Sequence, residues 1–201
     1  EHINPESVGN HRNIVVSDQS GKSNIMSRLK TIGIDIKEDD PKIKKLLEEV
    51  KDREFIGYSY DGADASFELL ARRIIAQIPR YISIKEYDVS VKKNNKDEII
   101  SKAKAMLEVD GDQIICEGEG NGPVHALDNA IRNNVDKLEK YAKYLRDLKL
   151  VDYKVRILNT GTEAVTRVSI ESTDSEGKNW FTIGVSTNII DASFKALIDS
   201  L

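Results

Sequence analysis

The chain has 201 residues, enough for one or two domains with an apolar core. Hydrophobic residues make up 39% and charged residues 32%, as in globular proteins, and a net charge of −4 argues against a broad nucleic-acid-binding surface. No apolar run approaches the roughly 20 residues that span a bilayer. A single cysteine, Cys116, excludes an internal disulfide and is expected to be a buried strand residue. We therefore expect a cytoplasmic protein that binds neither nucleic acid nor membranes.

Residues 1–78 predict a small helical subdomain. The polar first 13 residues show little periodicity, so we expect an irregular arm. They carry no signal peptide and no initiator Met, so we expect the arm to lie inside a longer chain. A short extended run over 14–16 precedes a helix that Ser23 is expected to cap and that runs to about residue 34. Asp40-Pro41 begins a second helix, because Asp caps and Pro suits the first helical position. A third helix is predicted from 61–64 to about 77, before Pro79.

After Pro79 the apolar period changes to two, which is typical of strands. The chain then predicts strand-strand-strand-helix twice, with hairpin signals at Asp110-Gly111-Asp112 and over 174–178. Apolar residues at helical spacing favour one long helix from Pro123 to Leu145. The expected strands are 82–91, 103–109, 113–118, 150–158, 164–173 and 179–185, and the last helix is 190–201.

The two halves form an internal repeat with an offset of 66 residues. Aligning Gly118 with Gly184 pairs Ala126 with Ala192, and it also aligns Val124 with Ile190, Ala130 with Ala196 and Ile131 with Leu197. A strand-helix unit cannot bury its apolar face alone, but two copies about a pseudo-two-fold axis can. We predict an α+β fold with a βββα-βββα domain over 79–201. Six strands with two helices on one face would leave the other face for a second copy to cover.

Gly21-Lys22-Ser23 lies between an expected strand and a helix, as a phosphate-binding loop would. That motif requires glycine at position 16, where this chain has Val16, so a turn and helix cap is favoured. A nucleotide-binding switch remains a rival hypothesis, and it predicts sensitivity to Lys22→Ala.

The segment Gly118–Pro123 joins a strand to a helix and has two interpretations. The glycines can let the chain turn tightly into a helix whose first turn holds Pro123. Alternatively, free amides at the helix start can bind a carboxylate. The segment is not a dinucleotide-binding fingerprint, because Pro123 replaces the final glycine.

Catalytic and metal-binding patterns are not evident in the sequence. His2, His11 and His125 are scattered, and no histidine pair has ligand spacing. Trp180 is interpreted as a core residue. We therefore predict no catalytic residue and no metal site in this chain.

Several segments in order resemble the citramalate synthase and 2-isopropylmalate synthase family. They are His2–Asn10, Val16–Asn24, Tyr60–Glu68, Gly118–Pro123, Leu150–Tyr153, Gly184–Ser186 and Ala192-Ser193. The resemblance implies an acyltransferase that condenses acetyl-CoA with a 2-oxo acid. It also implies a catalytic barrel, with a divalent metal acting as Lewis acid, before residue 1. This chain would then hold the linker and the regulatory domain, with no cofactor of its own.

The resemblance further implies a homodimer that binds a branched-chain amino acid as feedback inhibitor: isoleucine, or leucine in the isopropylmalate branch. Where the first repeat has Gly120-Asn121-Gly122 the second has Ser186-Thr187-Asn188, so only one of the two helix starts is expected to bind well. A dimerisation module without ligand is the alternative. The residues carried over to the effector site are Gly120, Gly122, Val124, Leu150, Tyr153, Ile157, Thr162, Ala164 and Thr166.

Overall fold

The computed structural model describes residues 21–159, 161 and 164–201, so the predicted arm and the run over 14–16 lie outside it. Three helices come first, and they pack around one apolar core that includes Tyr60 and Phe67. Asp40 caps the second helix as predicted: its carboxylate accepts a hydrogen bond from the Lys42 amide at 2.8 Å. The prediction that Ser23 caps the first helix is wrong, because that helix, α1 (Lys22–Thr31), includes Ser23 and has Gly21 as its N-cap. The helices are α1 (Lys22–Thr31), α2 (Pro41–Phe55) and α3 (Asp64–Ile75).

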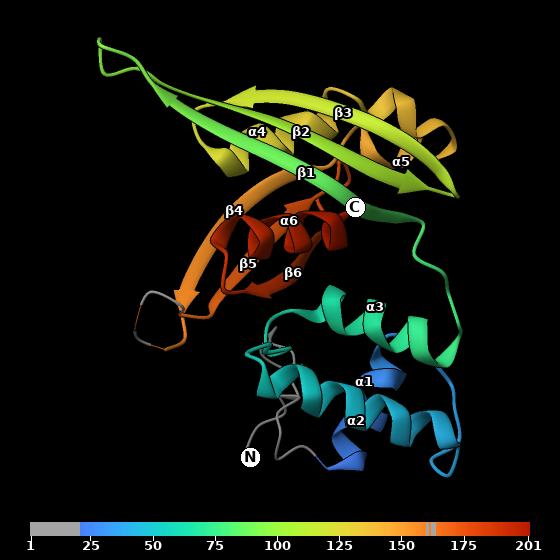
Figure 1. Cartoon of the computed structure of the whole chain (residues 1–201). Coiled ribbons are helices and arrows are strands. Elements are labelled where there is room, and N and C mark those ends of the chain that lie inside the picture. The colour runs from blue at the N-terminus through green and yellow to red at the C-terminus, as the bar shows by residue number, and fades with distance from the viewer. Residues whose placement is uncertain (1–20, 160, 162–163) are drawn as a thin grey trace.

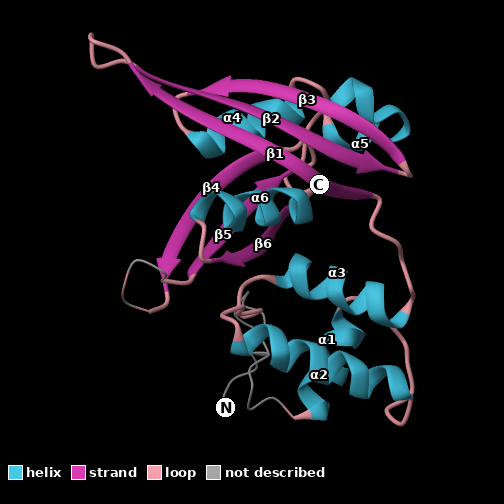
Figure 2. Cartoon of the chain, in the orientation of Figure 1, coloured by secondary structure: helices cyan, strands magenta, loops and turns pink. Residues whose placement is uncertain are grey.

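Two βββα repeats follow, as predicted (Figure 1, Figure 2). The strands form two antiparallel three-stranded sheets, β1-β2-β3 and β4-β5-β6, rather than one six-stranded sheet. Each sheet is covered by its own helix. We call the side that the helix covers the inner face and the opposite side the outer face. The two helices contact each other over one shared core. The first repeat is β1 (Ile82–Lys93), β2 (Ile99–Val109), β3 (Asp112–Gly120) and α4 (Pro123–Arg132). The second is β4 (Lys149–Ile157), β5 (Thr166–Thr173), β6 (Asn179–Ser186) and α6 (Ile189–Ser200).

The aligned glycines explain how each helix packs on its sheet. A Cβ on Gly118 would lie 2.3 Å from the Ala130 amide nitrogen, and one on Gly184 would lie 1.9 Å from the Ala192 carbonyl oxygen. Both glycines therefore permit close helix–strand contact, and their role is not a tight turn. The contacts in the two repeats involve the residues that the 66-residue offset aligns, which confirms the repeat.

The predicted long helix from Pro123 to Leu145 is wrong. α4 ends at Arg132, a 3-10 segment η2 (Val135–Tyr141) follows, and α5 (Ala142–Leu145) is one short turn. The Asn134 side chain donates to the Ala130 carbonyl at 2.8 Å and to the Glu117 carbonyl at 3.0 Å. Asparagine commonly ends helices in this way, because its side chain competes for backbone hydrogen bonds.

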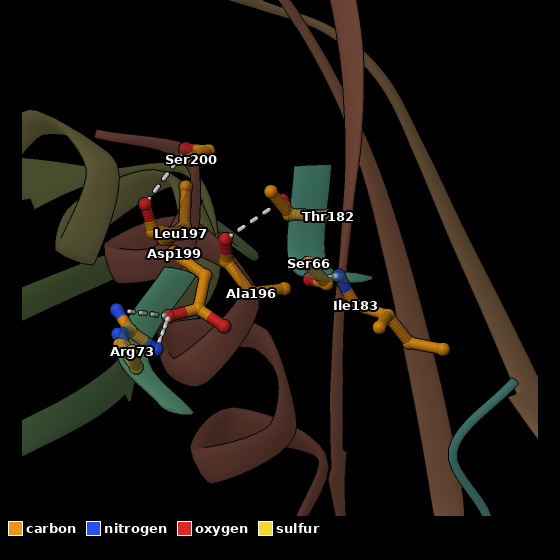
Figure 3. Close-up of polar contacts among 8 residues, drawn as sticks. All are labelled: Ser66, Arg73, Thr182, Ile183, Ala196, Leu197, Asp199 and Ser200. Carbon is orange, nitrogen blue, oxygen red and sulfur yellow. Dashed lines mark hydrogen bonds and ion pairs between the residues drawn. The ribbon is translucent and has the colours of Figure 1, made fainter. Parts of the chain in front are cut away.

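The helical subdomain packs on the outer face of the second sheet. Ser66 on α3 accepts a hydrogen bond from the Ile183 amide at 3.0 Å, while the neighbouring Thr182 donates to the Ala196 carbonyl at 2.9 Å (Figure 3). Arg73 on α3 contacts Asp199 on α6 at 3.3 Å. The second sheet therefore lies between α6 and α3, whereas the outer face of the first sheet carries exposed lysine–glutamate pairs such as Lys104–Glu117.

Candidate functional site

The two repeat helices begin differently. At the start of α6 the Asn188 side chain accepts hydrogen bonds from the amides of Ile190 (2.8 Å) and Asp191 (3.3 Å). The corresponding N-cap of α4 is Gly122, which has no side chain. Within the described residues, the amides of Val124 and His125 have no acceptor. The start of α4 therefore keeps free donors at the positive end of a helix dipole, where a carboxylate binds well.

Gly120 brings the last residue of β3 against that first turn. A Cβ there would lie 2.7 Å from the Ala126 nitrogen and 2.9 Å from the His125 carbonyl carbon. Gly122 differs, since nothing in the described part of the chain lies within 4 Å of a Cβ built on it. The backbone at Gly122 is extended (φ −157°, ψ 167°), which any residue can adopt.

On β4, the candidate residues Leu150, Tyr153 and Ile157 share the inner face. Strict alternation would place Leu150 and Tyr153 on opposite faces, because they are three residues apart. A β-bulge between Leu150 and Asp152 corrects this, so Leu150 pairs with Ser172 and Tyr153 pairs with Ile170. β1 has the matching bulge between Ile84 and Glu86, again with an offset of 66.

Tyr153 links this strand to α6, because its hydroxyl lies 2.8 Å from the Ser193 hydroxyl. Its counterpart in the first repeat is Tyr87, whose ring packs edge-on against Phe194 with centroids 5.2 Å apart. Burial, and then the nearby Asp191 carboxylate, raise the pKa of the Tyr87 hydroxyl. The two tyrosines thus flank α6 from different sheets.

The remaining candidates lie where β4 ends and β5 begins. Ile157 is 67% exposed and pairs across the sheet with Thr166, which is buried. Ala164 lies in the loop between these strands, and its amide donates to the Gly161 carbonyl at 3.3 Å. Thr162 lies outside the described residues.

The structure brings part of the candidate set together. Val124, Leu150 and Tyr153 pack against the same buried core, although they come from different repeats. Ile157, which is exposed, pairs with the buried Thr166 at the end of the second sheet. The first repeat offers free amides and the second offers apolar side chains, which are the two kinds of group that a small molecule with a carboxylate and an aliphatic group would need.

Sequence reasoning missed Ser101. Its side chain is fully buried on the inner face of β2, directly across from Gly120. Its hydroxyl has no hydrogen-bond partner among the residues that the structure describes. The signal was present in the sequence, because Ser101 extends the inward series Ala103, Ala105 and Leu107 by one polar position.

Other sites predicted or rejected from the sequence can now be located. Lys22 lies in α1 and pairs with Glu38 at 3.8 Å, while Val16 lies outside the described residues. Cys116 is fully buried in β3, as predicted, and burial raises the pKa of its thiol. Trp180 is half-buried against the shared core and donates to the Ser200 carbonyl. In the described ranges, no group of three or more His, Cys, Asp or Glu side chains could hold a metal ion. No helix there is long and apolar enough to cross a membrane.

The model of the LeuA allosteric (dimerisation) domain family matches residues 61–201. The chain belongs to this family. The match includes α3, which was predicted to belong to the helical subdomain. Among curated proteins, the chain is 45% identical to an (R)-citramalate synthase of Aquifex aeolicus and 44% identical to one of Geobacter sulfurreducens. Each alignment covers 100% of this chain and 38% of the relative. A probable 2-isopropylmalate synthase of Methanopyrus kandleri is 26% identical over 98% of this chain and 38% of its own length.

Proposed function

We propose that the chain is the C-terminal regulatory portion of a citramalate synthase-like acyltransferase and that it binds isoleucine as a feedback inhibitor. The whole enzyme would condense acetyl-CoA with pyruvate in the cytoplasm. The names of the relatives, of which this chain spans 38%, support that assignment. The divalent metal and the catalytic groups would belong to the barrel that precedes this portion.

The observations that carry the effector proposal are the uncapped start of α4 and the apolar inner face of β4, which pack on the same core. The free amides of Val124 and His125 would bind the carboxylate of the amino acid. Leu150, Tyr153 and Ile157 would contact its aliphatic side chain. Thr162, Ala164 and Thr166 would close the site at the end of the sheet.

The exposed ends of β1 and β4 support a homodimer. Val91 and Ile157 occupy equivalent positions in the two repeats, and they are 55% and 67% exposed on the inner faces. Exposed apolar side chains such as these suit a two-fold dimer interface, in which the same surface of both subunits is buried. The family's description, which names dimerisation, agrees with this.

Calorimetric titration of the chain with isoleucine, leucine and valine tests the effector proposal. We expect saturable binding that prefers isoleucine. Tyr153→Ala should weaken isoleucine binding about tenfold or more, which is a loss of about 1.4 kcal/mol or more of binding free energy. Tyr144→Ala is the matched control, because Tyr144 is 65% exposed on α5 and outside the site.

The other outcomes separate the alternatives. A preference for leucine would move the chain to the isopropylmalate branch. A dimer in sedimentation analysis that binds none of the three amino acids at millimolar concentration would favour a dimerisation module without ligand. Equal affinity in wild type and Tyr153→Ala would place the ligand away from β4.

A further inference from the structure

Two arginines lie directly opposite each other on the outer face of the second sheet. Arg156 on β4 pairs with Arg167 on β5, and Arg167 alternates with buried residues that face inward. Cross-strand partners have Cα atoms about 4.5–5.5 Å apart, and like charges at such positions destabilise a sheet. Burial, and then the charge of Arg156, lower the pKa of the Arg167 guanidinium. Arginine nevertheless stays protonated in proteins, so the two positive charges face each other at physiological pH.

The first repeat has no such pair at the equivalent place. The 66-residue offset aligns Arg156 with Ser90, and Ser90 pairs with Lys102, which takes the place of Arg167. Lys102 forms an ion pair at 2.5 Å with Glu119 on β3, whereas the partner of Arg167 on β6 is apolar. Opposed cations are therefore not a requirement of the fold, and the second repeat retains a destabilising contact that the first lacks.

Both arginines keep hydrogen-bond donors for a ligand. The Arg167 Nε atom donates to the Gly57 carbonyl at 2.6 Å, which fixes this half-buried side chain. Its two Nη atoms have no acceptor in the described part of the chain. The exposed Arg156 forms no hydrogen bond or ion pair with any described residue. The pair thus offers one guanidinium that is held in place and a second that is free to move onto a ligand.

The two arginines line one open hollow of about 420 Å³. Its other lining residues are Lys154, Val155 and Ser169, so no described carboxylate lines it. Asp152 and then Glu171 act on Lys154 and raise its pKa. These acids therefore balance the lysine, and the charges of the two arginines stay unbalanced.

We infer that the outer face of the second sheet holds an anion site, in which Arg156 and Arg167 together bind one phosphate group. Two opposed guanidiniums can reach one compact ion, and a tetrahedral phosphate offers oxygens to both planar forks at once. A carboxylate has two oxygens in one plane, which suits a single fork. Because the hollow is open, the group can be free phosphate or the phosphate of a larger molecule. The site is separate from the proposed effector site, since Arg156 and the adjacent Ile157 face opposite sides of β4.

Arg156→Ser tests the site, because it copies the residue of the first repeat. An NMR titration of the backbone amides with inorganic phosphate, at constant ionic strength, should give saturable shifts in β4 and β5 of the wild type. The variant should bind phosphate at least about tenfold more weakly. Its melting temperature without phosphate should equal that of the wild type or rise by about 2–4 °C, because the repulsion between the arginines is gone.

Arg146→Ser is the matched control. Arg146 is exposed, its ion-pair partner is Asp136, and it lies outside the hollow. This variant removes the same charge, so it should bind phosphate like the wild type. Equal loss of affinity in both variants would mean that phosphate responds to net charge alone, and that result would overturn the inference.

Three ligands separate the sources of the phosphate and test its class. Phenyl phosphate that binds more tightly than inorganic phosphate would indicate a larger phosphate-bearing molecule, and the reverse order would indicate free phosphate. Malonate, a dicarboxylate, should bind more weakly than both. Tighter binding of malonate, or no saturable shift in β4 and β5 with any phosphate, would overturn the inference. The effector proposal is independent of these outcomes, because its residues on β4 lie on the inner face.

Discussion

The two βββα repeats share their helix–strand packing and differ at the helix starts and on the outer sheet faces. Gly118 and Gly184 make equivalent close contacts with α4 and α6. By contrast, Gly122 leaves one helix start open where Asn188 closes the other. The shared features are those that a helix on a sheet requires, so the differing features are the places to look for function.

The outer faces show the same division. The second sheet is covered by α3, with Ala63 packed on Ile183 and Val185. The first sheet instead presents ion pairs such as Lys102–Glu119 to solvent. One repeat therefore connects to the helical subdomain, while the other carries the free helix start.

The largest expected effect comes from breaking what the repeats share. Gly184→Ala would place a Cβ 1.9 Å from the Ala192 carbonyl oxygen, and Gly118→Ala would place one 2.3 Å from the Ala130 nitrogen. Because backbone atoms cannot rotate away, we expect each variant to lose about 3 kcal/mol of unfolding free energy or more. Urea unfolding measures this.

Gly21→Ala is the control for those variants, since the nearest atom to its Cβ in the described part of the chain is 3.7 Å away. It should lower the free energy of unfolding by no more than about 1 kcal/mol, because Gly21 is the N-cap of α1 and alanine is less favourable there than glycine. If Gly118→Ala were as mild as this control, the first repeat would tolerate a looser helix and the repeats would not be equivalent in packing.

A smaller effect is expected where only the second repeat is involved. Ser66→Ala removes the acceptor of the Ile183 amide and leaves a buried donor unpaired. We expect it to lower the free energy of unfolding by about 1–3 kcal/mol. On the exposed outer face of the first sheet, Lys104→Ala removes the ion pair with Glu117. It should lower the free energy of unfolding by less than about 1 kcal/mol. Thermal unfolding of both variants compares the faces directly. Equal losses would contradict the view that only one outer face is an interface.

The sequence predicted the repeat because its signals are local and recur. Small residues at a fixed offset, such as Ala126 and Ala192, mark helix–sheet contact wherever it occurs. The Asp40-Pro41 helix start was likewise correct, because both residues act on their own backbone. These features depend on neighbours within a few residues.

Other features depended on partners that sequence spacing does not reveal. The bulge that brings Leu150 and Tyr153 to one face is set by pairing with β5. The break after Arg132 depends on Asn134 reaching Glu117 in another element. The buried Ser101 hydroxyl, which has no hydrogen-bond partner among the described residues, was missed because only the packed structure shows it. The effector residues themselves stay a prediction that binding experiments must test.

The smallest expected effect concerns the turn that begins β3. Hydrogen bonds from Lys140 and then Tyr141 lower the pKa of the Asp110 carboxyl below its usual value near 3.8. In the second repeat, Asp174 bonds instead to the turn's own backbone, at Glu176 and Lys178. The Asp110 side chain therefore bonds the segment after α4, whereas the Asp174 side chain bonds its own turn, from which the Ser175 hydroxyl donates to the Asp147 carboxylate at 3.4 Å.

The sign of the pH dependence follows from this lowered pKa. Asp110 stabilises the fold fully above its unfolded pKa, and the contribution is lost as the pH falls through the lower folded pKa. In Lys140→Ala we expect the Asp110 titration, followed by carboxyl-carbon NMR, to move up toward 3.8, because the first cause of the shift is removed. Tyr141→Phe should move it less. An Asp110 titration that does not move in Lys140→Ala would mean that Lys140 is not the main cause of the lowered pKa.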